Sequence, residues 1–244
     1  MTTIALITGA NKGIGFATAR LLGARGITVL AGARDESRGR LAERDLVASG
    51  ADARFVPLDV TDDKSVARAA EWIDAEYGVL DILVNNAGIA RGDGRGRPSE
   101  TTLGTLRAVY ETNVFGVVAV TNAMLPLLRR SPAPRIVNVS SHAASLTITS
   151  DPAGPFATAT LLPSAAYTPS KSALTALTVQ YANELRKDGI LVNAVAPGYV
   201  DTDSNNHTGI LPVAKAAAVL VRLATLGADG PTAGFFSEEG QVPW

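Results

Sequence analysis

The sequence contains no cysteine and has no excess of either charge. Without cysteine the chain forms neither disulfides nor a thiolate nucleophile, which excludes a disulfide-stabilised fold and thiol chemistry. Lysine and arginine together number 22 and aspartate and glutamate 23, so the formal net charge is −1. This balance offers no basic surface to nucleic acid or to an anionic membrane. The arginines of residues 91–97 are interleaved with glycines, as in a solvated loop.

Long apolar runs are missing as well. The first apolar run, Ile4–Ile7, stops at Thr8-Gly9, so it is too short for a signal peptide and has no basic leader. No apolar segment approaches the roughly 18 residues that are needed to cross a bilayer. We therefore expect a cytoplasmic protein with neither a membrane nor a nucleic-acid partner.

What the sequence does contain is an alternation of short apolar runs with longer amphipathic ones. The expected strands, bounded by Gly, Pro, Asp or Asn, are Ile4–Thr8, Thr28–Ala31, Arg54–Leu58, Ile82–Val84, Arg135–Val139, Leu191–Ala196 and, at the end, Thr232–Phe236. The expected helices are Gly15–Ala24, Ser37–Ser49, Lys64–Tyr77, Thr105–Arg130 and Ala166–Lys187. This alternation predicts a doubly wound α/β fold with a parallel sheet, a single Rossmann-type domain over residues 1–244. Residues 146–164 break the rhythm and predict an irregular insertion.

The first strand runs through a glycine-rich turn directly into a helix. Glycines let backbone amides approach a pyrophosphate closely, and the helix N-terminus adds unpaired N–H groups and the positive end of the helix dipole. The preceding strand and the following helix favour dinucleotide binding over a purely structural turn. The residues expected to meet the dinucleotide are Gly9, Asn11, Lys12, Gly13, Ile14 and Gly15.

The residue after the second strand predicts which dinucleotide is bound. A carboxylate about 20 residues beyond the glycine turn accepts the ribose 2′-hydroxyl of NAD. Arg34 stands near that position instead, and a guanidinium suits the 2′-phosphate of NADP(H). Lys12 and Arg38 can add positive charge. Two alternatives remain: Arg34 is a surface charge, or a shift of one residue places Asp35 at the ribose and favours NAD.

Polar and small residues follow the third and fourth strands. Asp59, beside Val60, can accept from the adenine amino group or cap the next helix. The segment Asn85-Asn86-Ala87-Gly88 offers asparagine amides that tie loops together and two small residues beside which a cofactor ring can lie.

Tyr167 and Lys171 stand four apart at the start of a helical segment and so share one face. A phenol with a pKa near 10 is a poor proton donor and acceptor at neutral pH. A nearby ammonium stabilises the phenolate and brings that pKa toward the working range. The pair predicts acid–base chemistry, although the spacing alone also arises by chance.

Three further segments have side chains or backbone turns suited to the same site. Ser140 and Ser141 end the fifth strand, at the carboxyl edge where doubly wound sheets bind ligands. Asn113, within a helical pattern, can hold a water near Lys171. Pro197-Gly198 turns the chain over the cofactor site, with Thr202 available to a carboxamide.

The two histidines do not predict a metal or a nucleophile site. His142 and His207 lie far apart, with no cysteine and no zinc-binding spacing. The Gly-x-Ser-x-Gly pattern of a hydrolase is also missing. We interpret both histidines as packing or loop residues and expect no metal.

These motifs together resemble the short-chain dehydrogenase/reductase family from Thr3 to about Thr202. The motifs are the Thr8–Gly15 turn, Asn85–Gly88, Asn113, the Ser140-Ser141 pair, Tyr167-x-x-x-Lys171 and Pro197-Gly198. The resemblance implies that Ser141 is the catalytic serine, Tyr167 the acid/base, Lys171 its partner and Asn113 part of the proton relay. The cofactor set that it completes is Arg34, Asp59, Val60, Asn86, Ala87, Gly88, Tyr167, Lys171, Pro197, Gly198, Val200 and Thr202, besides the glycine turn.

Within that family the chain is similar to the carbonyl reductases in Asn11–Gly15, in Ala33-Arg34-Asp35 and from Gly234 to Trp244. The resemblance implies NADPH-dependent reduction of a ketone or aldehyde. Two departures are the long interval from Ser141 to Tyr167 and the missing glycine-rich tail of tetrameric members, so we expect a monomer or a small homo-oligomer. The alternatives are an NAD-dependent alcohol dehydrogenase and a non-catalytic NADP(H)-sensing protein.

Overall fold

The computed structural model describes residues 2–90, 97–154, 164–205 and 207–244. They form one eight-stranded sheet in the order β3-β2-β1-β4-β5-β6-β7-β8. Neighbouring strands are parallel up to β7, and β8 pairs antiparallel with β7. The strands are β1 (Ile4–Thr8), β2 (Thr28–Ala33), β3 (Ala53–Pro57), β4 (Ile82–Asn85), β5 (Arg135–Val139), β6 (Leu191–Val195), β7 (Phe235–Ser237) and β8 (Gly240–Gln241). The predicted doubly wound α/β fold is confirmed.

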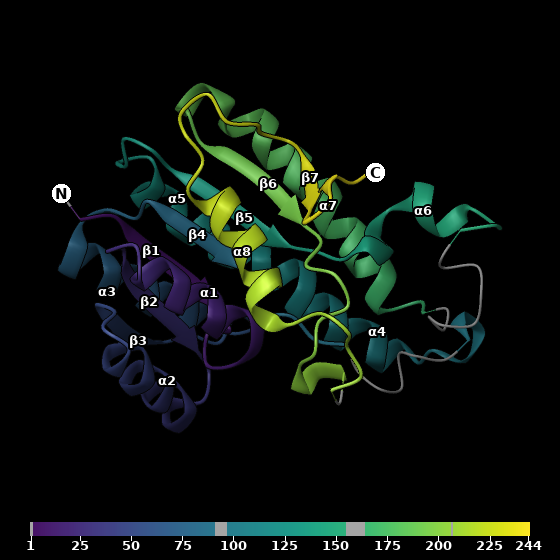
Figure 1. Ribbon diagram of the computed structural model, residues 1–244, viewed down its shortest axis with the longest axis horizontal. Helices are drawn as coiled ribbons and strands as arrows, with labels where there is room; N and C mark the ends of the chain where they lie inside the picture. Colours follow the sequence, from purple (N-terminus) through teal and green to yellow (C-terminus); the bar gives the residue numbers. More distant parts are fainter. Residues whose placement is uncertain (1, 91–96, 155–163, 206) are drawn as a thin grey trace.

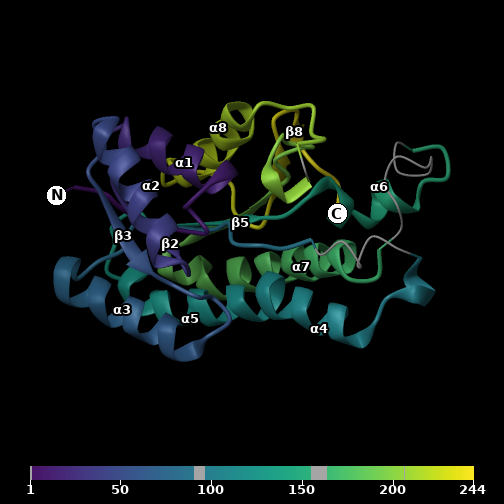
Figure 2. The same ribbon diagram turned by 90° about the horizontal axis from the view of Figure 1, so that it is seen from below.

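Helices cover both faces of the sheet (Figures 1 and 2). One face carries α1 (Gly13–Gly23), α2 (Glu36–Ala48) and α8 (Val213–Ala224). The other carries α3 (Asp63–Tyr77), α4 (Leu103–Tyr110), α5 (Gly116–Leu128) and α7 (Tyr167–Leu185). Shorter helices are η2 (Pro98–Glu100), the π-helix η3 (Glu111–Phe115), η4 (His142–Ala144), α6 (Leu146–Ser150), η5 (Arg186–Asp188) and η6 (Asp203–Asn205).

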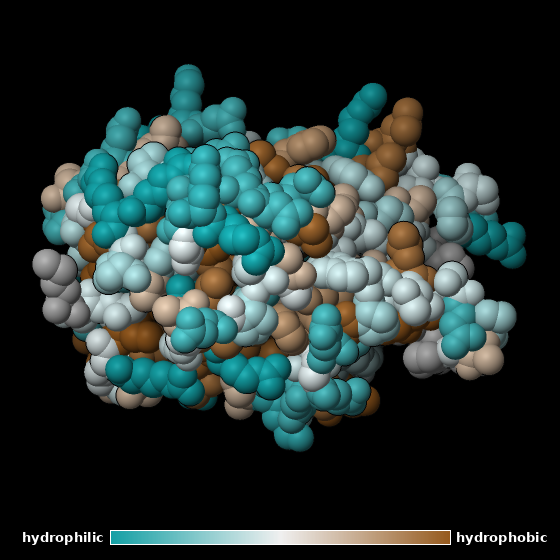
Figure 3. All heavy atoms as spheres, turned by 90° about the horizontal axis from the view of Figure 1, so that it is seen from above, coloured by the Kyte–Doolittle hydropathy of each residue, from teal (hydrophilic) through white to brown (hydrophobic). Residues whose placement is uncertain are grey.

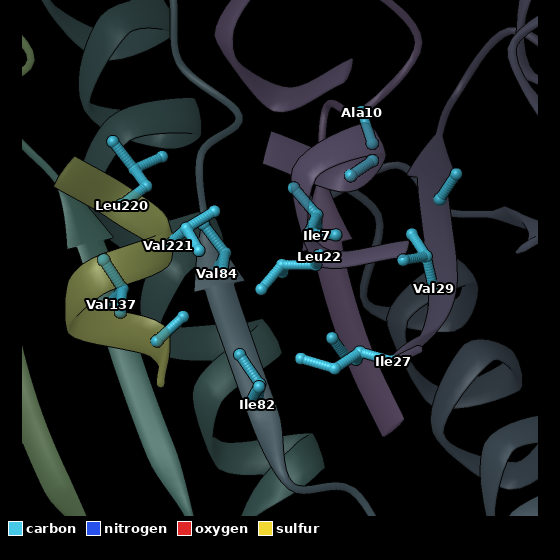
Figure 4. Packing of buried hydrophobic residues seen from close by; sticks show 14 of the residues in the cluster. Ile7, Ala10, Leu22, Ile27, Val29, Ile82, Val84, Val137, Leu220 and Val221 are labelled. Carbon is cyan, nitrogen blue, oxygen red and sulfur yellow. The ribbon is translucent and has the colours of Figure 1, made fainter. Parts of the chain in front are cut away.

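Two hydrophobic clusters lie on opposite sides of the sheet because side chains alternate along each strand. In β1, Ile7 joins the cluster beneath α1 and α8, where it lies with Leu22 and Val84 (Figure 4). Leu6 joins the cluster beneath α3, α5 and α7, with Met124 among its members. Every residue of β1 is buried, as expected of a central parallel strand.

Some elements differ from those expected. The helix expected over Thr105–Arg130 runs from Leu103 to Leu128 and contains the π-turn η3. By length and composition it could cross a membrane, but 61% of its most apolar window is buried inside the protein. The last strand was expected at Thr232–Phe236 and begins instead at Phe235.

Two further differences concern a short and a long helix. The expectation of an irregular segment over 146–164 is wrong at its start, because Leu146–Ser150 is helical with Ser145 as its N-cap. Residues 155–163 of that segment lie outside the described residues. Helix α8 was not expected at all.

The surface on the face drawn in Figure 3 is mostly hydrophilic, and hydrophobic residues appear there in separate groups. Among the described residues, the large exposed hydrophobic side chains include Leu103, Phe115, Leu146, Tyr199 and Ile210. Leu103, Phe115 and Leu146 come from three different helices, whereas Tyr199 and Ile210 are neighbours in the segment after β6, where the Ile210 N–H donates to the Tyr199 carbonyl at 2.9 Å. Single exposed apolar side chains need no special role.

Candidate active site

The order in which the chain adds strands to the sheet reverses between β1 and β4. From β1 the chain proceeds outward to β2 and β3, whereas β4 begins the series that proceeds the other way. In open α/β sheets the crevice outside the carboxyl ends at such a point is where ligands bind. The segments that meet here follow Thr8 and Asn85.

The glycine turn after β1 has a geometry that requires glycine. Gly9 and Gly13 have φ of +65° and +57°, which side chains disfavour. A Cβ on Gly15 would lie 2.5 Å from Asn86 Nδ2 and 2.6 Å from the Gly9 carbonyl oxygen. No described side chain caps α1 at Lys12, so N–H groups of its first turn remain available. The turn therefore fits a phosphate group.

The turn is bound to the segment after β4. Asn86 Nδ2 donates to the carbonyls of Thr8 and Gly9 at 2.8 and 3.1 Å. Thr8 Oγ1 accepts from the backbone N–H groups of Asn86 and Ala87 at 3.0 and 2.9 Å. The contribution of Thr8 was not predicted, although its place at the last position of β1 was visible in the sequence. Within the glycine turn and the start of α1, Asn11 and Ile14 are half-buried, and Ile14 packs against the hydrophobic core.

Arg34 and Asp35, directly after β2, have different surroundings. Arg34 is exposed. Asp35 is the N-cap of α2, and its Oδ1 accepts from the Arg38 backbone N–H at 2.9 Å and from the Ser37 hydroxyl at 2.7 Å. These two hydrogen bonds hold the pKa of the Asp35 carboxyl below its usual range. The Asp35 carboxylate thus caps α2, while Arg34 is exposed directly after β2.

Asp59 lies after β3 with its Oδ1 accepting from the backbone N–H and hydroxyl of Thr61 at 3.0 and 2.8 Å. The next helix is capped by Asp62, so the alternative in which Asp59 caps it is wrong. Val60 lies against the start of α5, where a Cβ on Gly116 would be 2.8 Å from the Val60 carbonyl oxygen.

Tyr167 is the first residue of α7 and Lys171 follows one turn later. The Lys171 side chain is buried, and its Nζ donates to the Val139 carbonyl at 2.8 Å. Nζ lies 5.9 Å from the centre of the half-buried Tyr167 ring. Burial lowers the pKa of the Lys171 ammonium to about 8. The end of β5 thus positions a buried ammonium beside a phenol.

Asn113 lies in the π-turn and is fully buried. Its Oδ1 accepts from the Ile89 N–H at 2.9 Å, and its Nδ2 donates to the Ile89 carbonyl and to Ser170 Oγ, each at 3.0 Å. A Cβ on the intervening Gly88 would lie 3.2 Å from Lys171 Nζ and 3.3 Å from Asn113 Oδ1. Asn113 and Lys171 therefore both lie beside Gly88, and Ser170 is a member of the cluster that was not predicted.

The two serines after β5 differ in their contacts. Ser140 is buried and its hydroxyl donates to the Lys171 carbonyl at 3.2 Å. Ser141 is half-buried and is the N-cap of η4, its Oγ accepting from the Ala143 N–H at 3.2 Å. The hydroxyl proton of Ser141 is not used in that bond, so it can be donated to a bound oxygen.

The chain after β6 turns back toward the glycine turn. Gly198 has φ of +87°, and Val200 is buried and pairs with Leu211. Pro197 and Thr202 are half-buried. Thr202 Cγ2 is 3.7 Å from the place where a Cβ on Gly13 would be. Next to it, Asp203 Oδ2 accepts from Lys12 Nζ at 2.8 Å, so the Lys12 ammonium has a partner that the sequence did not predict.

The histidines lie in different surroundings. His142 is half-buried, and burial lowers its pKa. His207 is exposed and bonded to Asp201 and Asp203. Within the described part of the chain, no group of three or more His, Asp or Glu side chains is arranged to hold a metal ion.

Comparisons with known proteins agree with this geometry. The short chain dehydrogenase family matches residues 3–209. A short-chain dehydrogenase of Penicillium roqueforti is 38% identical, over 92% of this chain and 89% of that protein. Carbonyl reductase (NADPH) 1 of Bos taurus is 36% identical, over 99% of this chain and 98% of that one.

The solved structures give the same result. The crystal structure of NADPH-bound carbonyl reductase from chicken fatty liver is similar with a TM-score of 0.85 and 29% identity, covering 100% of this chain and 99% of that chain. The family match, the fold and the order of the site segments along the chain all indicate the same family. The chain therefore belongs to the short-chain dehydrogenase family, and within it is most similar to the carbonyl reductases.

Proposed function

We propose that this protein binds NADP(H) and reduces the carbonyl group of a small ketone or aldehyde to an alcohol. The observation that carries the proposal is the buried Lys171 ammonium beside the Tyr167 ring, with Asn113 of the π-turn on the other side of Gly88 and Ser141 directly after β5. The bovine relative is named for NADPH, and the chicken carbonyl reductase holds it, which supports this cofactor.

The residues at the switch point fit a dinucleotide. Gly9, Gly13 and Gly15 leave room that a Cβ would fill, and the first turn of α1 presents uncapped N–H groups to a pyrophosphate. Arg34 is exposed at the edge where a 2′-phosphate is expected, and a guanidinium pairs well with such a group. When bound, the nicotinamide supplies the hydride for the carbonyl carbon.

The chain's own residues then manage the oxygen and its proton. Ser141 donates a hydrogen bond to the carbonyl oxygen, and Tyr167 transfers its phenolic proton to that oxygen as the alcohol forms. Lys171 stabilises the resulting phenolate by charge. Asn113 fixes Ile89 and Ser170, and the second lone pair of its Oδ1 can hold a water from which the proton is restored.

Replacing Tyr167 by Phe tests the proposal. The ring and its packing remain while the proton donor is lost, so NADPH-dependent turnover of a carbonyl panel should fall by at least about 100-fold. NADPH binding, followed by fluorescence, should change little. Tyr181→Phe is the matched control, because Tyr181 lies on the same helix and its hydroxyl bonds to Asn122 instead. Full activity in Tyr167→Phe would refute the assignment.

Two variants separate NADP(H) from NAD as the cofactor. Arg34→Ala should raise the KM for NADPH by about tenfold or more and leave that for NADH nearly unchanged, because only the former carries the phosphate. Asp35→Ala should lower thermal stability through loss of the α2 cap without improving NADPH use. If instead the wild type preferred NADH, and Asp35→Ala could no longer use NADH, the chain would be an NAD-dependent alcohol dehydrogenase. Tight NADPH binding without any turnover would favour the sensing protein.

A further inference from the structure

The segment that follows β6 is folded on itself. Val200 pairs with Leu211, and the Asp201 N–H donates to the Leu211 carbonyl at 3.0 Å. Asn205 Nδ2 donates to the Val200 carbonyl at 2.8 Å, and its Oδ1 accepts from the Thr202 N–H at 3.3 Å. Residues 200–205 and Leu211 are therefore joined by hydrogen bonds within the segment.

One ion pair joins this segment to the glycine turn. Lys12 Nζ and Asp203 Oδ2 are 2.8 Å apart, although 191 positions separate them in the sequence. Lys12 immediately precedes α1, and Thr202, beside Asp203, lies over Gly13. Figure 1 shows the yellow-green segment between β6 and α8 next to the purple turn between β1 and α1. The ion pair thus joins the segment after β6 to the residue that precedes α1, the helix whose N-terminus is expected to meet the pyrophosphate.

His207 organises the acidic side of this pair. Its Nδ1 is 2.7 Å from Asp201 Oδ1 and its Nε2 is 3.0 Å from Asp203 Oδ1. Ionised carboxylates only accept hydrogen bonds, so both ring nitrogens must donate, which requires the imidazolium form. The hydrogen bond to Asp201, followed by the attraction of both carboxylates, raises the pKa of His207. His207 also has φ of +58°, a conformation that non-glycine residues seldom adopt.

Charges on the facing elements are consistent with this arrangement. The charged groups acting on His207 are Asp201 and Asp203, and those acting on Asp203 are Lys12 and His207. The Lys12 hydrogen bond lowers the pKa of Asp203, so this carboxylate is ionised at neutral pH. The Asp203 carboxylate therefore accepts from the Lys12 ammonium at Oδ2 and from the His207 imidazolium at Oδ1.

We propose that Asp203 and His207 are positioning residues that, through Lys12, hold the segment after β6 against the glycine turn and slow the release of the bound dinucleotide. We name Lys12, Asp203, His207 and Asp201 the clasp. The inference rests on the proposed function, because it takes NADP(H) as the ligand that the clasp retains. Neither residue needs to touch the cofactor or the reacting atoms.

The first test measures NADP⁺ release by stopped-flow fluorescence in the full-length protein. Asp203→Asn should speed release by about two- to fivefold, the range expected of one exposed ion pair, and the difference should shrink at high salt. Glu238→Gln is the control, since Glu238 pairs with Lys215 at 3.6 Å with similar exposure but outside the site. In a Lys12→Met background the Asp203→Asn change should have no further effect. An equal effect in both backgrounds would overturn the proposal.

The second test follows pH. Release from the wild type should accelerate as pH rises through the raised pKa of His207, above 6.5, because the imidazolium is then lost. His207→Gln should release quickly at every pH and give a flat profile. A wild-type profile that is itself flat across this range would contradict the role of His207.

A third measurement separates the clasp from the cofactor assignment. The chain has 2 histidines, so the His207 ring proton can be assigned by NMR with His207→Gln and titrated in the free protein. Asp203→Asn should lower the pKa of His207, and an unchanged pKa would overturn the clasp. Absence of NADPH binding in the wild type, with the His207 pKa still dependent on Asp203, would refute the proposed function and the retention role but leave the ion-pair geometry intact.

Discussion

Lys171 carries an ammonium that is held away from water. The residue is 4% exposed, and its Nζ donates a hydrogen bond to a backbone carbonyl, that of Val139, rather than to a carboxylate. Burying an ammonium without a full counter-charge is unfavourable, and this is why its pKa falls from 10.5 to about 8. At the scale of single residues, the site therefore reduces the stability of the fold.

Lys171→Met should make the protein more stable and inactive. Between pH 8 and 10.5 the unfolded chain holds more protons on this lysine than the folded chain, so its cost is complete below pH 8 and declines as pH rises toward 10.5. We expect a gain of about 1–3 kcal/mol in the free energy of unfolding at pH 7, measured by urea denaturation. The gain should shrink at pH 10. Lys187→Met, at an exposed position, should change stability by less than about 0.5 kcal/mol.

At the scale of elements, the π-turn between α4 and α5 determines where Asn113 points. A π-turn holds one residue more than the α-helical turn it replaces, and such turns are frequent at functional sites. Here it lets the long helix keep Val109 in the core while Asn113, four residues on, bonds to Ile89 and Ser170. The π-turn therefore contains the residue whose side chain joins the helix to Ile89 and to α7.

Deleting Glu111, an exposed residue of the π-turn, should test this role. The helix can close into regular α geometry, so that α4 and α5 keep their places in the core while Asn113 loses the widened turn in which it lies. We expect helical content by circular dichroism to be retained and kcat to fall by about 100-fold or more, because Asn113 is misplaced. Glu111→Ala keeps the residue count and should be nearly fully active. Normal activity in the deletion would show that the π-turn is dispensable.

Whether an element could be predicted depends on how far apart in the sequence the residues lie that determine it. Apolar runs such as Ile4–Thr8 determine buried strands locally, so the sheet was foreseen. The π-turn was not, because one added residue hardly disturbs a helical period over Leu103–Leu128. Helix α8 was not predicted, although its buried Val219, Leu220 and Leu223 have the spacing of an amphipathic helix.

The same distinction between local and distant residues applies to the candidate site. The spacing of Tyr167 and Lys171 is local, and it predicted that the two side chains lie on one face of a helix. The partners of Thr8 and Lys12 depend on the tertiary fold, since Asn86 and Asp203 are 78 and 191 positions away. Such pairs become visible only when the segments after different strands are brought to one edge.

At the scale of the whole molecule, the site joins segments from the entire chain. The turns after β1, β4 and β5 and the segment after β6 meet at one edge of the sheet, and α7 supplies Tyr167 and Lys171. A ligand that contacts all of them is bound only by the folded state. Its binding must therefore raise the stability of the complete fold and not that of one element.

Thermal unfolding with added dinucleotide measures this coupling. At a free NADPH concentration about 100 times its Kd, stability should increase by about 2.7 kcal/mol and Tm by roughly 5–10 °C in a single transition. NADH at the same concentration should give a much smaller rise, because the contact of Arg34 with the phosphate is missing. In Arg34→Ala the difference between the two dinucleotides should become smaller, whereas Arg44→Ala, at an exposed arginine within α2, should behave as the wild type. Equal shifts for NADPH and NADH in the wild type would mean that the site does not recognise the 2′-phosphate.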